Sequence, residues 1–343
     1  MKMEPLRLAV LDVGQGDTIV LSRPSSGEAI VVDCVDEHGV FDYLRSQQVQ
    51  IVRALILTHL HSDHYRRAVA FLRNCERKLG SACERLIVNP LPPKAPEPDE
   101  DSEVFPQEFE TFVRWMRENR ELVLGVPSSR QLPLEGLLAQ QVDFLFPYVA
   151  DFPTARSLGY NNTSIVLRVR GSGSSALLTG DMESAGWELI PRRKLAAKAD
   201  VLKFPHHGAW KKRDGSPADT DQFLKEVGAK IVVFSVGSRQ RGYNHPDPHV
   251  FEAARTAGAT ILCTQATRHC GLTAPEAERH QTEPLLGAQL RAIGAASVLC
   301  TNGTPCAGTV IIDLEDTPII RSPNPATHRQ EIVERVFANK HQC

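Results

Sequence analysis

The chain has 343 residues, 39 of them basic and 41 acidic, so its formal net charge is −2 at pH 7. This balance argues against a surface coated with basic groups for duplex DNA, and 42% hydrophobic content predicts a sizeable core. No apolar run approaches the ~18 residues that a membrane span requires. Charges in the N-terminal stretch MKMEPLRLAVLDVGQGD argue against a signal peptide, so we expect a cytoplasmic protein without membrane contact. Eight cysteines in a chain of this length predict reduced thiols or metal ligands.

The first third of the chain alternates short strand-like and helix-like segments. Strands are expected at 7–13, 18–22, 29–32 and 52–57, and a helix at 65–79. Residues 90–103 are acidic and rich in proline, which predicts a loop, and 108–121 have the spacing of an amphipathic helix. We interpret 90–135 as a peripheral insertion.

The strand pattern returns from residue 142 onward. Strands are expected at 164–169, 175–179, 200–204, 230–235 and 309–314, and helices at 182–195, 219–227, 249–256 and 327–339. Residues 321–326 (RSPNPA) predict a loop. We therefore expect one main domain at 1–265 and a C-terminal extension at 266–343 that can pack on the same domain.

The stretch Thr-His-Leu-His-Ser-Asp-His at 58–64 carries the strongest chemical signal. It offers three imidazoles and one carboxylate within six residues, directly after an expected buried strand. Both groups bind divalent metals, at ~2.0–2.2 Å. His59 and His61 can point the same way from an extended turn, while Asp63 and His64 begin the next element and face a second metal. The alternative is a polar loop with surface histidines.

Further candidate ligands follow other expected strands. Asp33 ends one apolar run, Asp181 follows another, and His206 and His207 come after a third. Ligands at several strand ends are expected of an α/β site built on one edge of a sheet. The order of Asp181, His206 and His207 after the first motif predicts that they add ligands to the same edge of the fold.

The His-x-His-x-Asp-His pattern resembles the metallo-β-lactamase superfamily, and the flanking motifs are similar to the hydrolase domain of ComEC-type DNA-uptake proteins. These motifs are LDVGQGD at 11–17, NNTS at 161–164, LTGD at 178–181, ADVLKFPHHG at 199–208, SVG at 235–237 and NHP at 244–246. The resemblance covers about residues 5–265. It implies a four-layer αβ/βα sandwich with two metal ions at one edge of two packed sheets, here with a Cys-containing C-terminal extension.

The resemblance also implies ligand roles by position. His59 and His61 would bind one metal, Asp63 and His64 the other, and Asp181 would bridge the two.

The remaining roles follow from the same resemblance. His206 or His207 would complete the second site, and His207 is favoured because the family's last histidine usually precedes glycine. Asp33, Asp17 and Asn162 would lie behind the ligands and orient them.

The chain departs from the family pattern in three places. No histidine lies between His64 and His206, where many relatives have a ligand, and 161–162 is Asn-Asn, so we expect the first metal to be weakly held. ComEC-type domains often lack the second histidine of the first motif, so His61 makes this copy more competent to bind metal. Residues 65–67 (Tyr-Arg-Arg) replace the common Gly-Gly, which narrows the site and adds positive charge.

Two divalent ions, zinc or manganese, ~3.5–4 Å apart suit hydrolysis of a phosphodiester by a metal-bound hydroxide. Asp63 or Asp181 would orient that hydroxide, and His245 is a candidate general acid, although it can equally stabilise a Pro-rich turn. Basic residues beside the motifs are candidate phosphate contacts, with a solvated charged loop as the alternative. They are Lys203, Lys211, Lys212, Arg66, Arg67 and Arg241.

The resemblance favours a nuclease acting on single-stranded or unwound DNA. A protein partner in a multi-component system is a further expectation. Two alternatives stay open, because a fold does not fix a substrate. One is a hydrolase of a cyclic nucleotide, another small phosphodiester or a thioester. The other is a binding or regulatory module with a degraded metal site.

The C-terminal part holds a separate set of candidate ligands for a structural zinc. They are Cys263, His269, Cys270, Cys300 and Cys306. Their spacing exceeds that of short zinc knuckles, and buried free thiols are the alternative.

Overall fold

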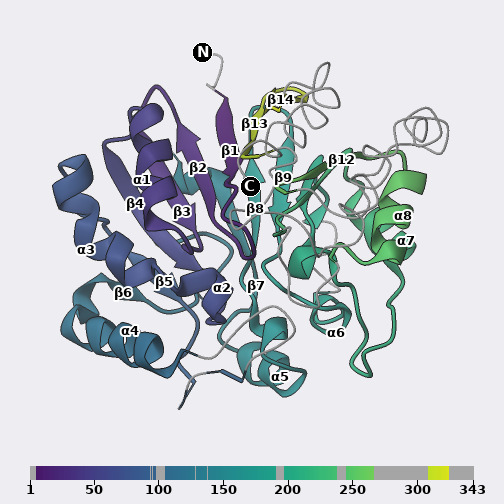
Figure 1. Cartoon of the computed structure of the whole chain (residues 1–343), viewed down its shortest axis with the longest axis horizontal. Helices are drawn as coiled ribbons and strands as arrows, with labels where there is room; N and C mark the ends of the chain where they lie inside the picture. Colours follow the sequence, from purple (N-terminus) through teal and green to yellow (C-terminus); the bar gives the residue numbers. More distant parts are fainter. Residues whose placement is uncertain are drawn as a thin grey trace, which may run out of the picture.

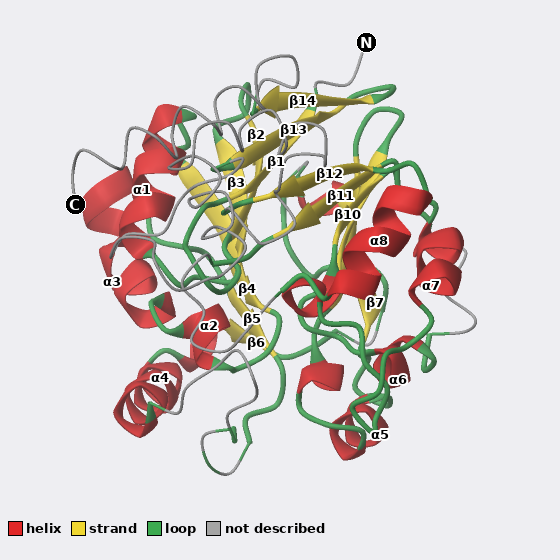
Figure 2. Ribbon diagram, turned by 45° about the vertical axis from the view of Figure 1, so that its right-hand side comes forward, coloured by secondary structure: helices red, strands yellow, loops and turns green. Residues whose placement is uncertain are grey.

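The structure is a four-layer sandwich in which two β-sheets face each other and helices cover both outer faces (Figures 1 and 2). It is a computed structural model that describes residues 5–92, 94, 96–97, 105–127, 129–136, 138–190, 197–237, 245–265 and 308–323. The arrangement confirms the α/β sandwich that the sequence predicts.

The first sheet combines strands from the N-terminal third with two strands from near the end of the chain. Its strands are β1 (Leu6–Val10), β2 (Ile19–Arg23), β3 (Glu28–Val32), β4 (Ile51–Leu57), β5 (Leu86–Val88), β6 (Val123–Leu124), β13 (Val310–Leu314) and β14 (Pro318–Ser322). Within the described residues their order is β14-β13-β1-β2-β3-β4-β5-β6. Strands β3 to β6 are parallel, so their carboxyl ends lie at one edge.

The second sheet comes from the following part of the chain. Its strands are β7 (Val142–Phe146), β8 (Val166–Arg170), β9 (Ser175–Leu178), β10 (Val201–Lys203), β11 (Ile231–Phe234) and β12 (Thr260–Cys263). Within the described residues their order is β12-β11-β10-β9-β8-β7. Strands β9 to β12 are parallel, which again brings several carboxyl ends to one edge.

Alternation of side chains along the strands builds the core between the sheets. In β1, Leu8 and Val10 enter this core, whereas Ala9 faces the outer helices. Leu167 and Leu178 meet them from the second sheet. Each fully buried leucine contributes roughly 2 kcal/mol, so this core holds the two sheets against each other.

Helices on the two outer faces complete the layers. They are α1 (Glu37–Ser46), α2 (Ser62–Tyr65), α3 (Ala68–Leu79), α4 (Pro106–Glu118), α5 (Phe152–Ser157), α6 (Ser184–Trp187), α7 (Thr220–Val227) and α8 (Pro248–Thr256). Helix α7 begins where Asp219 accepts a hydrogen bond from the Gln222 amide, and it ends at Gly228 in the left-handed region. No helix in the described ranges is long and apolar enough to cross a membrane.

The expected strands are confirmed to within a few residues, but three of the expected helices need correction. The helix expected at 65–79 is two helices, because α2 ends at Tyr65 and α3 starts at Ala68. The helix expected at 108–121 is α4, which starts and ends earlier. In the span 182–195, α6 covers only four residues; 191–196 lie outside the described residues.

Other elements escaped the sequence patterns. Strand β14 occupies the start of the loop expected at 321–326, and helix α1 and strands β5, β6 and β12 were not expected. These strands are short, and short strands give weak periodic signals. The helix expected at 327–339 lies outside the described residues.

Strands β13 and β14 come from within the expected C-terminal extension and lengthen the first sheet beyond β1. The Asp313 carboxylate accepts hydrogen bonds from Arg7 (Nε to Oδ1, 2.7 Å) and from Arg321 (Nε to Oδ2, 2.7 Å). Burial would raise the pKa of Asp313, but the bonds from the two guanidinium groups outweigh it and hold the pKa below its usual value. The carboxylate therefore ties the late strands to the first one.

We predict that Asp313→Asn lowers the free energy of unfolding at pH 7 by about 2 kcal/mol, because it leaves Arg7 with a weaker partner. Urea titration measures this loss. Since the folded-state pKa is depressed, the difference from wild type is full above the unfolded-state pKa of ~3.9 and disappears as the pH falls through the folded-state value.

The matched control is Glu252→Gln, which removes the carboxylate of an exposed pair with Arg255. Its effect should be much smaller than that of Asp313→Asn, because solvent screens an exposed ion pair. Equal losses in the two variants would contradict a special role for Asp313.

Candidate metal centre

Asp33, at the end of β3, fixes the histidine-rich loop that follows β4. Its Oδ1 accepts a hydrogen bond from the Thr58 amide at 2.7 Å, and its Oδ2 accepts one from the Thr58 hydroxyl at 2.7 Å. The same Oδ2 lies 2.8 Å from Nδ1 of His64. All three residues are buried, so this carboxylate sets both the backbone of the loop and the orientation of one ring.

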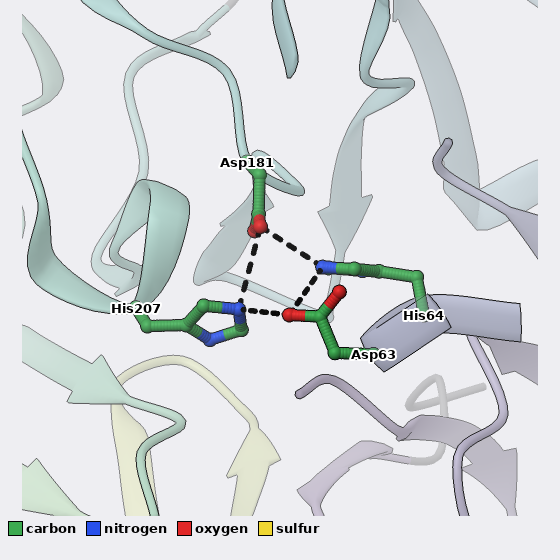
Figure 3. Close-up of side chains that lie close together, drawn as sticks. All are labelled: Asp63, His64, Asp181 and His207. Atoms are coloured by element: carbon green, nitrogen blue, oxygen red, sulfur yellow. Dashed lines mark hydrogen bonds and ion pairs between the residues drawn. The ribbon is translucent and has the colours of Figure 1, made fainter. Parts of the chain in front are cut away.

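Four side chains from three separate segments converge in front of this loop (Figure 3). His64 Nε2 lies 3.0 Å from Asp181 Oδ2, and His207 Nε2 lies 3.3 Å from the same oxygen. His207 Nε2 is also 3.3 Å from Asp63 Oδ2. Asp63 and His64 come from α2, Asp181 follows β9, and His207 follows β10. Their ligand atoms all lie within 4.8 Å of one another.

The backbone at His206 and His207 is left-handed, with φ of 46° and 51°. Such angles are strained for residues other than glycine, and strain of this kind concentrates at functional sites. His207 Nδ1 lies 2.8 Å from the Ser235 carbonyl and can donate to it, which leaves Nε2 facing the cluster. His206 instead lies near Asn161, with 3.5 Å between its Nε2 and the amide nitrogen. Only His207 of this pair joins the four-residue cluster.

The glycine-rich turn after β1 packs directly against α2, the helix that carries Asp63 and His64. The Asp17 amide donates to the Asp63 carbonyl at 3.0 Å. A Cβ atom on Gly16, whose φ is +116°, would lie 2.2 Å from that carbonyl oxygen, so the close approach requires glycine. The Ser235 hydroxyl donates to the Gly16 carbonyl at 2.7 Å, which links the turn to the second sheet.

His59 and His61 form a second buried pair beside the cluster. His59 Nε2 lies 3.1 Å from His61 Nδ1, and the ring of His59 is 4.2 Å from that of His64, centre to centre. The Tyr160 ring packs at 5.2 Å from the His61 ring. Neither of the two ligand groups within the described residues includes this pair. The expected first metal site is therefore less complete in its geometry than the second.

Asn162, expected to orient the ligands, forms side-chain hydrogen bonds to residues at the start of α6. Its Oδ1 accepts from the Gly186 amide at 2.7 Å, and its Nδ2 donates to Glu183 at 2.9 Å. Its bonds brace α6 rather than a ligand of the cluster. The Glu183 carboxylate in turn lies 3.9 Å from His206 Nδ1.

His245 is a buried residue that precedes α8 and packs near His206. Its Nδ1 lies 3.3 Å from Asp247 Oδ1, and its ring is 6.2 Å from that of His206. Burial would raise the pKa of Asp247, but the hydrogen bond and charge of His245 lower it below its usual value. The carboxylate can thus hold the imidazole in one orientation.

The expected basic substrate contacts divide into two kinds. Lys203 is 1% exposed and its Nζ pairs with Asp17, so the expectation that it reaches a substrate at the surface is wrong. Lys212, Arg66 and Arg67 are exposed, and Lys211 is half-buried.

Two of these exposed groups already have partners within the protein. Arg66 lies over the Phe105 ring, 5.9 Å from its centre, and Arg67 Nε is 3.5 Å from Glu37. Cys263, the one candidate zinc ligand within the described residues, is buried. Arg241, a candidate phosphate contact, lies outside the described residues. So do the remaining candidate zinc ligands, His269, Cys270, Cys300 and Cys306.

Charge pairing dominates the electrostatics of the cluster. Burial would lower the pKa of both ligand imidazoles, but the facing carboxylates, Asp181 foremost, raise the pKa of His207 to about 10 and that of His64 well above its usual value. Burial would raise the pKa of Asp181, yet the two imidazoles hold it well below its usual value. The carboxylates of this buried cluster thus stabilise positive charge, which favours a cation.

Known proteins share this sequence pattern. A model of the metallo-beta-lactamase superfamily matches residues 11–216, more than half of the chain. ComE operon protein 3 of Bacillus subtilis (strain 168) is 26% identical over 276 residues, covering 74% of this chain and 31% of that protein. Competence protein ComA of Neisseria gonorrhoeae is 30% identical over 110 residues, covering 32% of this chain and 15% of that protein. The chain thus matches less than a third of either relative.

Solved structures with a similar arrangement include a diphosphatase from the PhnP family and a long form RNase Z from yeast. The first has a TM-score of 0.37 and 14% identity, and the match covers 75% of this chain and 94% of that one. The second has a TM-score of 0.41 and 11% identity, with 84% and 44% covered. The family match over more than half of its length establishes that the chain belongs to the metallo-β-lactamase superfamily.

Proposed function

We propose that the chain is a metal-dependent phosphodiesterase that cleaves nucleic acid, with single-stranded DNA as its substrate. The observation that carries the proposal is the buried group of two imidazoles and two carboxylates at Asp63, His64, Asp181 and His207. The match to a protein named for competence and the resemblance of the flanking motifs to ComEC-type DNA-uptake proteins support nucleic acid as the substrate class.

The donor set suits a divalent cation. Imidazole nitrogen and carboxylate oxygen together suit zinc or manganese. In this proposal Asp63, His64, Asp181 and His207 hold one ion, while the His59–His61 pair and Asp181 hold a second, weaker one. A bound ion of this kind polarises a phosphoryl oxygen and makes water more acidic.

Residues of the chain supply the remaining steps. Asp33 and the Ser235 carbonyl fix the two imidazoles so that each turns Nε2 to the centre. Within the described residues Asp63 Oδ1 has no hydrogen-bond partner, and we assign it to orient the attacking water. We assign to His245, held by Asp247, delivery of a proton to the leaving oxygen.

A second candidate function is hydrolysis of a small phosphodiester such as a cyclic nucleotide. It is favoured by Tyr65, which directly follows the ligand His64 and is 4% exposed. Its ring packs 5.3 Å from that of Phe112 in α4, so the insertion is fastened beside the ligand-bearing helix α2. An insertion held there would restrict access for a long strand.

Asp181→Asn should reduce hydrolysis by about 100-fold or more, because it removes a charged oxygen shared by both imidazoles. The assay compares cleavage of single-stranded DNA, duplex DNA and a cyclic dinucleotide with manganese, magnesium or zinc. Asp221→Asn, on the exposed face of α7, is the matched control and should keep wild-type rates. Equal residual activity in wild type and Asp181→Asn would overturn the enzymatic proposal, and a preference for the cyclic substrate would select the second candidate.

Asp33→Asn should weaken metal affinity about 10- to 100-fold, because the amide holds the Thr58 loop and His64 less firmly than the carboxylate does. Competition with a chromogenic chelator measures the change. The control is Asp42→Asn, whose carboxylate is 73% exposed on α1. Unchanged affinity in Asp33→Asn would argue against an orienting role.

His245→Gln should slow the cleavage of DNA by about 100-fold while leaving bis-p-nitrophenyl phosphate nearly unaffected. A nitrophenolate leaves without a proton, whereas a sugar hydroxyl requires one. His38→Gln, an exposed histidine of α1, serves as control. If both substrates slow equally in His245→Gln, the residue does not act as the proton donor.

A further inference from the structure

Lys203 is a buried cation placed behind the candidate metal ligands. It is the last residue of β10, and its side chain is 1% exposed. Its Nζ pairs with the Asp17 carboxylate, donates to the Gly180 carbonyl at 3.3 Å, and lies 3.6 Å from Asp181 Oδ1. A buried ammonium group is costly unless it is closely paired, so its position depends on these oxygens.

Within the described residues the site contains two overlapping groups of potential cation ligands. One is the cluster of Asp63, His64, Asp181 and His207; the other is Asp17, Asp33 and His64. All six side chains are buried. Both groups have the donor types of a metal site. Donor chemistry alone therefore does not determine which of the two binds metal.

His64 belongs to both groups but can serve only one of them. A neutral imidazole has one N–H and one lone pair. With Nδ1–H donating to Asp33 at 2.8 Å, its lone pair is on Nε2, which faces Asp181 at 3.0 Å. The second group therefore keeps two carboxylates and no nitrogen ligand.

Asp17 still requires a positive partner, because an unpaired buried carboxylate is strongly unfavourable. Lys203 Nζ supplies that charge from within the chain. The same ammonium lies on the Oδ1 side of Asp181, which matches the orientation in which Oδ2 faces the two imidazoles. One lysine thus balances the charge of Asp17 in the second group and lies beside Asp181, a ligand of the first.

We propose that Lys203 is an internal cation that takes the place of a divalent metal beside Asp17 and so confines metal binding to the Asp63–His64–Asp181–His207 cluster. The inference rests on the proposed metal dependence of the site. Lys203 is therefore a positioning residue, which acts through Asp17 and Asp181.

The test is a titration with Mn²⁺, in which electron paramagnetic resonance measures the free ion and equilibrium dialysis the number bound per chain. The variants are Lys203→Met, which keeps the length of the side chain without its charge, and the double variant Lys203→Met/Asp17→Asn, which restores neutrality. Lys225→Met, on the exposed face of α7, is the matched control.

Lys203→Met should bind about one more Mn²⁺ per chain than wild type, and Mn²⁺ should raise its melting temperature by more than it raises that of wild type. The double variant and Lys225→Met should bind as many ions as wild type. If Lys203 were merely structural, Lys203→Met would not gain a metal ion, and adding Asp17→Asn would not remove it.

The inference is overturned if Lys203→Met binds the wild-type number of ions. It is also overturned if Lys203→Met stays unfolded in Mn²⁺, because a metal ion then does not replace the ammonium group. This holds whether or not the double variant folds. Wild type that binds neither Mn²⁺ nor, in a parallel dialysis, Zn²⁺ would instead refute the proposed metal function. In that event, binding that appears only in Lys203→Met would still support the internal cation.

Discussion

The hydrogen bonds of the Asp33 carboxylate are the constraint on which the site depends. Asp33 is a non-glycine residue with φ of 58°, a strained angle that persists only where the surroundings compensate for it. Bonds to the Thr58 amide, the Thr58 hydroxyl and His64 provide that compensation. They also fix the position of the histidine loop relative to strand β3 of the first sheet. Together with the backbone bond from the Cys34 amide to the His64 carbonyl (2.7 Å), they fix the loop after β4 against the end of β3.

The two sheets then bring distant segments to the same place. Parallel pairing of β3 with β4 and of β9 with β10 sets four carboxyl ends in register, and the inter-sheet core holds the pairs together. The Gly16 turn closes against the Asp63 carbonyl and is anchored by Ser235 from the second sheet. The ligand cluster is therefore a product of packing between sheets and cannot be assembled by either one alone.

Much of the candidate site could be predicted from the sequence because its ligands follow apolar strands. The 58–64 motif, Asp181 and His207 each come directly after such a run, and strand ends of this kind meet at sheet edges. These residues do converge, although their roles remain proposals. The break between α2 and α3 could not be predicted, because it depends on how His64 is held by Asp33 from an earlier strand.

Lys203 shows why the remaining parts needed the structure. In the sequence it belongs to a segment with Lys211 and Lys212 downstream, which favours a surface contact with phosphate. Its burial results from pairing with Asp17, 186 positions earlier, and no local pattern encodes that meeting. The same holds for Asp313, whose partner Arg7 lies at the other end of the chain. Long-range charge pairs are properties of the fold.

The most direct test of the account is a crystal structure of the protein grown with zinc, with anomalous data collected on both sides of the zinc absorption edge. The account predicts an anomalous peak within about 2.0–2.3 Å of His64 Nε2, His207 Nε2 and a carboxylate oxygen of Asp181. A fully determined structure with no peak between these atoms, or with zinc only elsewhere, would contradict the claim that they form the metal centre.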